Sequence, residues 1–455
     1  MNSDPRKDAL RLAVIFLGRK RPGFDPAWGE AMAKKVRACL KKTGFQVFEP
    51  KEKVIDDPSL RAALADCERE GADVILTLHT TMADGRLAPT LAQLWRDPIV
   101  LWATPENQAG EMISSCSLVG VHTWAGSLRQ LNHPFEIVYG DPEDAALLDR
   151  LKQAARLART ARKVRLARVG VIGGQAPGFF AMSVDPFAVQ RGVGAQAQFF
   201  SLVEFADVVE GFSEEEVARD IAAFKALGIR HKDTTDEDLP MASRLYLAMR
   251  HYMENEGVDA LSVRCWPEMP GKFGQWPYVG LARLAEEGRA VACEGDGDGA
   301  LAALIGESLG MGRCALSDWL EHDAQTITLW HGGAAPMSLA PALGKPGGPR
   351  LALHFNNKKP AVIESTLRPG MPVTVFRLWR LEGRYLMTAC EGETIKPRRR
   401  LMGTNGLARM EGRDPREWFE DLCHAGMPHH VIVAQGAHAA LLKRFARLMN
   451  IQWID

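Results

Sequence analysis

The chain has 455 residues, of which 46% are apolar and 25% are charged, values typical of a globular protein with more than one domain. Its 56 basic and 56 acidic residues cancel, which argues against binding to nucleic acid through bulk positive charge. No apolar run approaches the roughly 20 residues needed to cross a bilayer. We therefore expect neither a nucleic-acid partner nor a membrane partner.

The eight cysteines are scattered along the chain and form no Cys-x-x-Cys pair. Most of them lie in apolar patterns, which is typical of reduced thiols and not of a disulfide framework. The polar start of the sequence leads into a short strand-like run at residues 12–17, without the longer apolar block of a secretory signal. These features predict a cytoplasmic protein.

The first third of the chain alternates short β-rich runs with amphipathic helical segments. Predicted strands cover residues 12–17, 46–48, 74–78 and 99–103, and predicted helices cover residues 26–42, 59–70 and 144–163. This alternation predicts a doubly wound α/β domain with a parallel sheet over residues 1–165.

The same alternation continues in a second predicted α/β domain, residues 166–345. Predicted strands cover residues 164–172, 199–206 and 260–263, and predicted helices cover residues 214–226 and 242–256. Because strands and helices alternate in both halves, the predicted fold class up to this point is α/β, with two doubly wound N-terminal domains. A pair of carboxyl-rich turns follows the later strands of the second domain.

After about residue 345 the pattern changes to closely spaced β-like runs, separated by turns that carry Asn, Pro and Gly. These runs cover residues 350–355, 361–366, 373–379 and 384–390, and a helix at 439–448 and a strand at 451–453 close the chain. We therefore predict a β-rich, barrel-like C-terminal domain over residues 346–455.

Carboxylates gather at the ends of two predicted strands of the second domain. Glu268 follows one strand, and Glu294 and Asp296 follow the next. Ligands of open α/β sheets bind at the carboxyl ends of strands, where converging carboxylates repel one another unless a cation lies between them. The alternative is that Asp296 and Asp298 are turn and cap residues of a helix that starts at Ala300. Spacing alone leaves both alternatives open.

Two other motifs are not expected to bind ions. Residues 170–178 follow a predicted strand, but they fit neither phosphate-binding glycine pattern, and Pro177 removes a backbone donor. We expect this stretch to form a loop over a ligand cleft. Asp296, Asp298 and Glu307 match three positions of a calcium-binding EF-hand loop, but Leu301 stands where that loop needs a glycine.

Three of the twelve histidines lie close together, with His429 and His430 before a predicted strand and His438 after it. A fourth, His331, follows a β-like run and precedes two glycines. Carboxylates and imidazoles together suit Mn²⁺, Zn²⁺, Fe²⁺ or Co²⁺ better than Ca²⁺. Because adjacent side chains on a strand point to opposite faces, we expect only one of His429 and His430 to face a given site.

Short motifs occur in a fixed order along the chain: Trp266-Pro267-Glu268, Ala292-Cys293-Glu294-Gly295-Asp296, Leu329-Trp330-His331-Gly332-Gly333 and Met427-Pro428-His429-His430. In this order they resemble the L-fucose/L-arabinose isomerase-like family. Near the N-terminus, Asn132-His133-Pro134-Phe135 fits the shorter, fucose-isomerase-like branch. The resemblance covers essentially the whole chain.

The resemblance implies a metal-dependent aldose–ketose isomerase that assembles as a homo-oligomer, a trimer or a hexamer. The implied metal is Mn²⁺, with Co²⁺, Mg²⁺ or Zn²⁺ as alternatives. By motif, the first glutamate ligand maps to Glu268. The second carboxylate maps to Asp296 in preference to Glu294, and the histidine maps to His430 in preference to His429.

The implied reaction moves a proton between C1 and C2 of a monosaccharide or sugar derivative through a cis-enediol(ate), while the metal polarises the carbonyl. Glu268 and Asp296 are the implied acid–base pair, and Asp298 is left as a helix cap. A different class of protein, a sugar-binding or regulatory protein on the same scaffold without turnover, is the alternative.

Substrate contacts are expected from side chains in the loops and motifs that surround the implied site. They are Trp102, Trp276, His331 and His438. Arg264 and the arginines at 398–400 are candidates for contact with an anionic substituent of the sugar, against the alternative that they are solvated or structural.

Overall fold

The structure, a computed structural model, describes residues 9–19, 24–109 and 111–455. The chain divides into two compact units, Met1–Lys163 and Val164–Asp455. The division lies near the predicted boundary at residue 165, and the predicted second and third domains both lie in the second unit. No helix in these described ranges is long and apolar enough to span a membrane.

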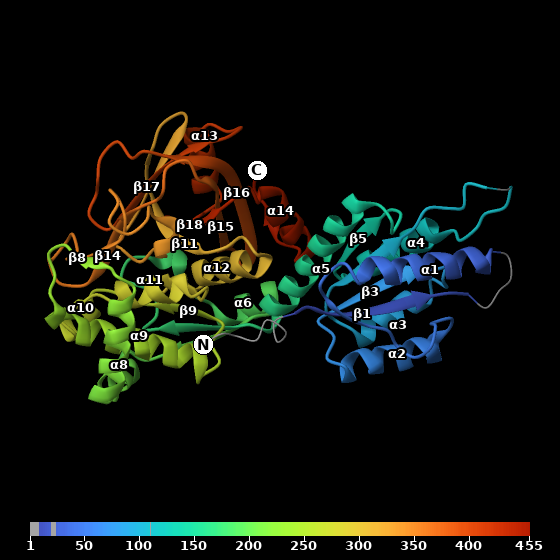
Figure 1. Cartoon of the computed structure of the whole chain (residues 1–455), viewed down its shortest axis with the longest axis horizontal. Coiled ribbons are helices and arrows are strands. Elements are labelled where there is room, and N and C mark those ends of the chain that lie inside the picture. The colour runs from blue at the N-terminus through green and yellow to red at the C-terminus, as the bar shows by residue number, and fades with distance from the viewer. Residues whose placement is uncertain (1–8, 20–23, 110) are drawn as a thin grey trace. The chain divides into compact units, whose positions relative to one another are not determined.

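The first unit is built on a parallel sheet (Figure 1). Its elements are β1 (Arg11–Leu17), α1 (Pro26–Leu40), β2 (Gln46–Phe48), α2 (Asp57–Arg69), β3 (Val74–His79), α3 (Leu87–Leu94), β4 (Ile99–Ala103), α4 (Ser117–Gln130), β5 (Phe135–Tyr139) and α5 (Ala145–Leu166). The strand order is β2-β1-β3-β4-β5. Alternate residues of β1 pack on opposite layers, Ile15 with α2, α3 and α4, and Val14 with α1 and α5.

The second unit begins with a parallel sheet in the order β10-β9-β6-β7. Its elements up to residue 309 are β6 (Arg168–Ile172), α6 (Pro186–Val193), β7 (Gln196–Phe200), α7 (Leu202–Glu210), α8 (Glu214–Ala226), β8 (Arg230–His231), α9 (Leu239–Glu254), β9 (Ala260–Val263), α10 (Glu268–Lys272), α11 (Tyr278–Glu286), β10 (Ala290–Cys293) and α12 (Gly297–Leu309).

One predicted strand of this unit, residues 199–206, is wrong beyond Phe200. The Ser201 hydroxyl accepts hydrogen bonds from the amides of Val203 and Glu204, and the Glu204 carboxylate accepts one from the Ser201 amide. This capping box starts α7, so the apolar residues that follow belong to a helix. The predicted strand at 164–172 is also shorter, because α5 continues to Leu166.

The rest of the second unit is rich in antiparallel strands. Its elements are β11 (Cys314–His322), β12 (Thr326–His331), β13 (Arg350–Ala352), β14 (Val362–Thr366), β15 (Pro372–Leu381), β16 (Arg384–Ile395), β17 (Thr404–Met410), α13 (Pro415–His424), β18 (His430–Gln435), α14 (Ala439–Leu448) and β19 (Gln452–Trp453). Strands in the order β16-β15-β18-β11-β12-β17 close into a barrel, because β16 also pairs with β17. The predicted fold class, α/β with a barrel-like C-terminal part, is confirmed.

Helix α12 lies between the parallel sheet and the barrel, and it contacts β9 and β10 as well as β11, β15 and β18 (Figure 1). Its N-cap is Asp296, whose side chain accepts a hydrogen bond from the Gly299 amide. The interpretation of Asp298 as the cap is wrong. Asp298 lies inside the first turn, where its carboxylate accepts hydrogen bonds from Arg380 and Tyr385 of the barrel.

Candidate active site

Polar side chains meet where the carboxyl edge of the parallel sheet adjoins the barrel. Glu294 follows β10, Asp318 lies in β11, and His331 ends β12. The antiparallel register of β11 and β18 pairs Asp318 with His430. The register of β11 and β12 pairs Asp318 with Trp330, the neighbour of His331. The pairing of distant strands therefore assembles this site.

Glu294 has a left-handed backbone conformation, with φ of 60°, and Gly295 follows at 78°. Such a conformation is costly for a residue with a side chain and is often found at functional sites. A Cβ atom at position 295 would lie 2.1 Å from the carbonyl oxygen of Gly174. The Ala176 amide also donates a hydrogen bond of 2.8 Å to the Glu294 carbonyl. The loop that starts at Gly173 therefore packs directly on this turn.

The Glu294 carboxylate is oriented by three side chains. The Trp266 indole N–H donates a hydrogen bond of 2.8 Å to Oε1, and His429 Nε2 lies 3.3 Å from Oε2. His430 Nε2 lies 3.4 Å from the same Oε2. Burial alone would raise the pKa of Glu294, but the hydrogen bond with His429 and the nearby His430 hold that pKa below its ordinary value. Glu294 is therefore an anion at neutral pH.

His430 is fully buried, and its two ring nitrogens have different surroundings. Nδ1 lies 2.9 Å from Asp296 Oδ2. Because the Asp296 carboxylate can only accept, Nδ1 must carry a proton. Nε2 has no hydrogen-bond partner among the described residues, and it lies 3.4 Å from Glu294 Oε2 and 3.5 Å from Asp318 Oδ1. This nitrogen faces two acceptor oxygens.

Two carboxylate oxygens and an imidazole nitrogen that converge in this way need a positive charge among them. A second proton on His430 is one source. Burial lowers the pKa of His430, but the hydrogen bond to Asp296 and the charges of Asp296, Asp318 and Glu294 outweigh burial and raise it above its ordinary value. A bound divalent cation is the other source, and oxygen with imidazole nitrogen is a typical donor set for such a cation.

Asp296 is fully buried and has both carboxylate oxygens engaged. Arg377 Nη1 donates a hydrogen bond of 2.6 Å to Oδ2, and Nη2 donates one of 2.8 Å to Oδ1. The Gly299 amide and His430 Nδ1 occupy the remaining acceptor sites. Burial opposes ionisation, but the Arg377 guanidinium and His430 hold the pKa of Asp296 far below its usual range. In this geometry Asp296 orients His430 and has no oxygen directed at a shared cation.

Among the described residues, two groups of side chains place possible ligand atoms within 4.8 Å of one another, and both include His430. One group is Glu294, His429 and His430, and the other is Cys293, His331 and His430. Burial raises the pKa of the Cys293 thiol well above its ordinary value, so Cys293 is a neutral thiol 2.9 Å from His331 Nε2. The first group, with its ionised carboxylate, is therefore the better match to a hard cation.

The rings of His429 and His430 lie 4.3 Å apart, and both reach Glu294. The expectation that only one of them faces a given site is therefore wrong. The reason is that β18 begins at His430, so His429 belongs to the preceding turn, where the alternation of a strand does not apply.

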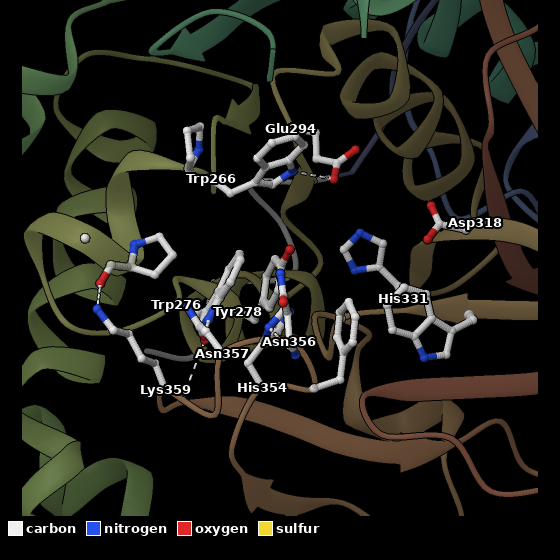
Figure 2. Close-up of a pocket in the computed structure, with 16 residues that line it drawn as sticks. Trp266, Trp276, Tyr278, Glu294, Asp318, His331, His354, Asn356, Asn357 and Lys359 are labelled. Atoms are coloured by element: carbon white, nitrogen blue, oxygen red, sulfur yellow. Dashed lines mark hydrogen bonds between the residues drawn. The ribbon is translucent and has the colours of Figure 1, made fainter. Parts of the chain in front are cut away.

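A pocket of about 490 Å³ opens beside these groups (Figure 2). Glu294, Asp318 and His331 line one part of it, and Lys359 lines another. Aromatic rings form much of its wall, and among them Trp276 stacks on His354 with ring centres 3.8 Å apart. A pocket of this size with aromatic walls and a few polar groups is typical of a site for a small polar molecule.

The family described as L-fucose isomerase, C-terminal domain matches residues 360–455, which include most of the barrel and both His429 and His430. Curated relatives extend the similarity to the whole chain. A sulfoquinovose isomerase of Priestia megaterium is 26% identical over 447 residues, which cover 96% of this chain and 98% of the relative. The family match and the full-length similarity together support a fucose-isomerase-like family for this chain.

Other relatives carry the same printed name. A sulfoquinovose isomerase of Alkalicoccus urumqiensis is 25% identical over 98% of this chain and 99% of its own length. One from a Clostridium species is 27% identical over 83% of this chain and 85% of its own length. A solved structure from Mycobacterium smegmatis covers 67% of the chain at a TM-score of 0.15 and 9% identity, a likeness too weak to bear on the fold.

The structure brings together only some of the side chains that the family resemblance singled out. His331 and Trp276 line the pocket. Glu268, the first residue of α10, forms an ion pair with Arg264 and belongs to neither group of possible metal ligands among the described residues. His438 is the N-cap residue of α14, and its Nε2 donates a hydrogen bond to the Gln435 carbonyl.

Trp102 belongs to the first unit, where it is completely buried in β4. Its indole N–H donates a hydrogen bond of 3.2 Å to the Gly140 carbonyl. A role in substrate contact therefore stays a prediction for Trp102, since its observed contacts are those of a core residue.

Sequence reasoning missed several residues of the site. Asp318 lies in a β-like run without any motif, and only its pairing with His430 reveals it. Arg377 lies between Phe376 and Leu378 in the apolar run of β15. An arginine in a buried strand is a detectable signal, because such a charge must be paired.

Proposed function

We propose that the protein is a metal-dependent aldose–ketose isomerase whose substrate is sulfoquinovose or a closely related sulfonated hexose. The aldose–ketose isomerase class follows from the full-length similarity to sulfoquinovose isomerases and from the fucose-isomerase-like family. The single observation that carries the metal site is the convergence of Glu294, Asp318 and the unpartnered nitrogen of His430.

We assign the metal to Glu294, His429 and His430, whose ligand atoms lie within 4.8 Å of one another. Mn²⁺ fits this set of oxygen and nitrogen donors, and Co²⁺, Mg²⁺ and Zn²⁺ are the alternatives to test. Bound there, the cation would polarise the sugar carbonyl and stabilise the charge that develops on oxygen. Glu268, the ligand implied by the family resemblance, would join this set only if its ion pair with Arg264 opened.

Asp318 is the side chain best placed to move a proton. It lines the pocket, it lies 3.5 Å from His430 Nε2 and 3.7 Å from His429 Nε2, and its side chain retains 22% exposure. A carboxylate at the edge of the metal group can accept a proton from one sugar carbon and return it to the next. We therefore propose Asp318 as the acid–base residue in place of the pair Glu268 and Asp296.

The remaining residues of the site hold this arrangement in place. Asp296 fixes the His430 ring so that Nε2 faces Glu294 and Asp318. The Trp266 indole holds one oxygen of Glu294, which leaves the other toward the histidines. Loss of a contact that orients a metal ligand typically lowers metal affinity or activity by about 10- to 100-fold.

The proposed substrate class follows from the relatives' name, and the pocket is suited to it. A hexose is small enough for a pocket of about 490 Å³, and aromatic walls favour the apolar faces of sugar rings. Of the arginines considered from the sequence, Arg398 pairs with Asp323 and Arg399 lies 3.9 Å from Glu321, both with exposed side chains. Those arginines are therefore occupied outside the pocket.

The test is a metal-dependent isomerase assay with purified protein. The chain is stripped with a chelator, reloaded with Mn²⁺ and incubated with sulfoquinovose in ²H₂O, and NMR follows the ketose and the deuterium that it gains at C1. Turnover that needs Mn²⁺ and fails in a Glu294→Gln variant supports the proposal. Equal turnover by the chelated protein, or none on sulfoquinovose and a panel of neutral aldoses, would refute it. Size-exclusion chromatography with light scattering tests the proposed trimer or hexamer.

A further inference from the structure

Lys359 is the only lysine or arginine among the residues that line the pocket in the described part of the chain. Figure 2 shows it on the side of the pocket away from Asp318 and His331. Glu294, Asp318 and the histidines hold the end where the C1 and C2 oxygens of a sugar would lie under the proposed function. A positive charge at the other end therefore faces the far end of the sugar chain.

The Lys359 ammonium is positioned by the protein but is not neutralised by it. Lys359 Nζ donates a hydrogen bond to the carbonyl oxygen of Pro270. This bond uses one of the three N–H groups of the ammonium. Within the described ranges no carboxylate forms an ion pair with it. Two donors and a full positive charge remain available at the surface of the pocket.

Asn357 adds a second donor beside this lysine. Its Oδ1 accepts hydrogen bonds of 2.9 Å from the Trp276 indole and 3.1 Å from the Lys359 amide. These two bonds fix the orientation of the amide group, because the oxygen must face both donors. The Nδ2 group, which can only donate, is then left on the opposite side of the same side chain. Both Asn357 and Lys359 line the pocket.

We propose that Lys359, assisted by Asn357, binds the sulfonate group of the substrate and is the residue that selects a sulfonated hexose over a neutral one. This inference rests on the proposed function for the identity of the sugar. In sulfoquinovose a sulfonate replaces the 6-hydroxyl of glucose, at the carbon farthest along the chain from C1. The group carries one negative charge over three acceptor oxygens, which matches a lysine ammonium with an adjacent amide donor.

Other basic residues near the pocket do not offer the same charge. Lys358, the preceding residue, does not line the pocket, and its Nζ contacts the Phe355 carbonyl and Met402 Sδ. Arg264 pairs with Glu268 and donates to the Gly173 carbonyl. Lys358 therefore provides a matched control, with the same charge in the same loop.

The experiment compares the Lys359→Gln and Lys358→Gln variants with the unaltered protein in the Mn²⁺-loaded form. Loss of a charge-assisted hydrogen bond predicts that Lys359→Gln lowers kcat/KM for sulfoquinovose roughly 10- to 100-fold, mainly through KM. Turnover of glucose and of 6-deoxyglucose, which lack the sulfonate, should be unchanged, and Lys358→Gln should behave as the unaltered protein. Equal losses for charged and neutral sugars, or no loss for sulfoquinovose, would overturn the assignment.

A binding measurement separates this proposal from the proposed function. Calorimetric titration with 6-deoxy-6-sulfoglucitol and with glucitol, two polyols that are not isomerised, reports the sulfonate contact without turnover. The sulfonated polyol should bind more tightly than glucitol to the unaltered protein, and Lys359→Gln should remove this difference. A preference that persists in the variant would overturn the assignment even if the enzyme is active, and its loss would support the assignment even if turnover fails. Lys359→Arg keeps the charge and should retain part of the preference for the sulfonated polyol. It serves as the test variant if Lys359→Gln does not fold.

Discussion

The replacement Asp296→Asn tests whether this residue orients His430 or binds the metal itself. In the structure the carboxylate accepts two hydrogen bonds from Arg377, one from the Gly299 amide and one from His430 Nδ1. The side chains of Asp296 and Arg377 are 0% and 1% exposed, so the variant leaves a buried guanidinium without a counter-charge. Breaking one partner of a buried ion pair typically costs about 3–5 kcal/mol.

The same variant should weaken metal binding without abolishing it. An asparagine can still accept from His430, but it no longer stabilises the ring orientation through a charge. Loss of such a carboxylate–histidine contact typically lowers metal affinity by about 10- to 100-fold. Titration with Mn²⁺ followed by electron paramagnetic resonance measures the affinity, and urea unfolding measures the stability of the second unit.

The matched control is Asp298→Asn, two residues further along the same helix. Asp298 is also buried and paired, with Arg380 and Tyr385, but it does not touch His430. Its replacement should reduce stability and leave Mn²⁺ affinity within about 2-fold of the unaltered protein, since no contact with the ligand set is lost. Complete loss of Mn²⁺ binding in a folded Asp296→Asn protein would refute the orienting role, and so would an unchanged affinity.

Three further predictions concern single residues. Glu294→Gln should abolish Mn²⁺ binding, whereas Glu268→Gln should change the affinity by less than about 3-fold, because only Glu294 lies with the histidines; the same titration checks both. Gly295→Ala should destabilise the second unit by about 1–3 kcal/mol in urea unfolding, because its Cβ would lie 2.1 Å from the Gly174 carbonyl oxygen. His79 has no hydrogen-bond partner among the described residues, and burial lowers its pKa to about 3. The unfolded chain therefore takes up a proton below about pH 6.5 while the folded first unit does not, so stability should fall by about 3 kcal/mol from pH 6.5 to 4 and fall less in His79→Leu. An identical pH dependence in the two proteins would contradict this.

The sequence predicts the layers of the fold better than it predicts the site. Alternation of residues along β1 and the amphipathic helices around it are local signals, and they predict β1 to β4 with α1, α2 and α5. They do not predict α3, α4 or β5. The strand predicted at residues 199–206 is wrong beyond Phe200 because a capping box at Ser201 starts a helix in the apolar residues that follow. Barrel closure between β16 and β17 depends on pairing that no local pattern contains.

The site residues divide in the same way. Glu294 and His430 lie in motifs that mark them as possible ligands, and in the structure they belong to the same group of possible metal ligands. Asp318 reaches them only through the register of β11 with β18, so its role depends on a contact between residues more than 100 positions apart. Asp296 looks like a ligand in sequence because nothing nearby shows that Arg377 will occupy its oxygens.

These contacts would also link the proposed metal binding to the folding of the second unit. Asp296 caps α12, pairs with Arg377 of β15 and bonds to His430 of β18, so one carboxylate ties the helix to two strands of the barrel. Without a cation, Glu294 and Asp318 place two oxygens near His430 Nε2, an arrangement that costs free energy unless His430 gains a second proton. A cation removes that cost only when the helix and the strands are in their native positions. Since a ligand that binds only the folded state stabilises it, Mn²⁺ should stabilise the second unit and have little effect on the first.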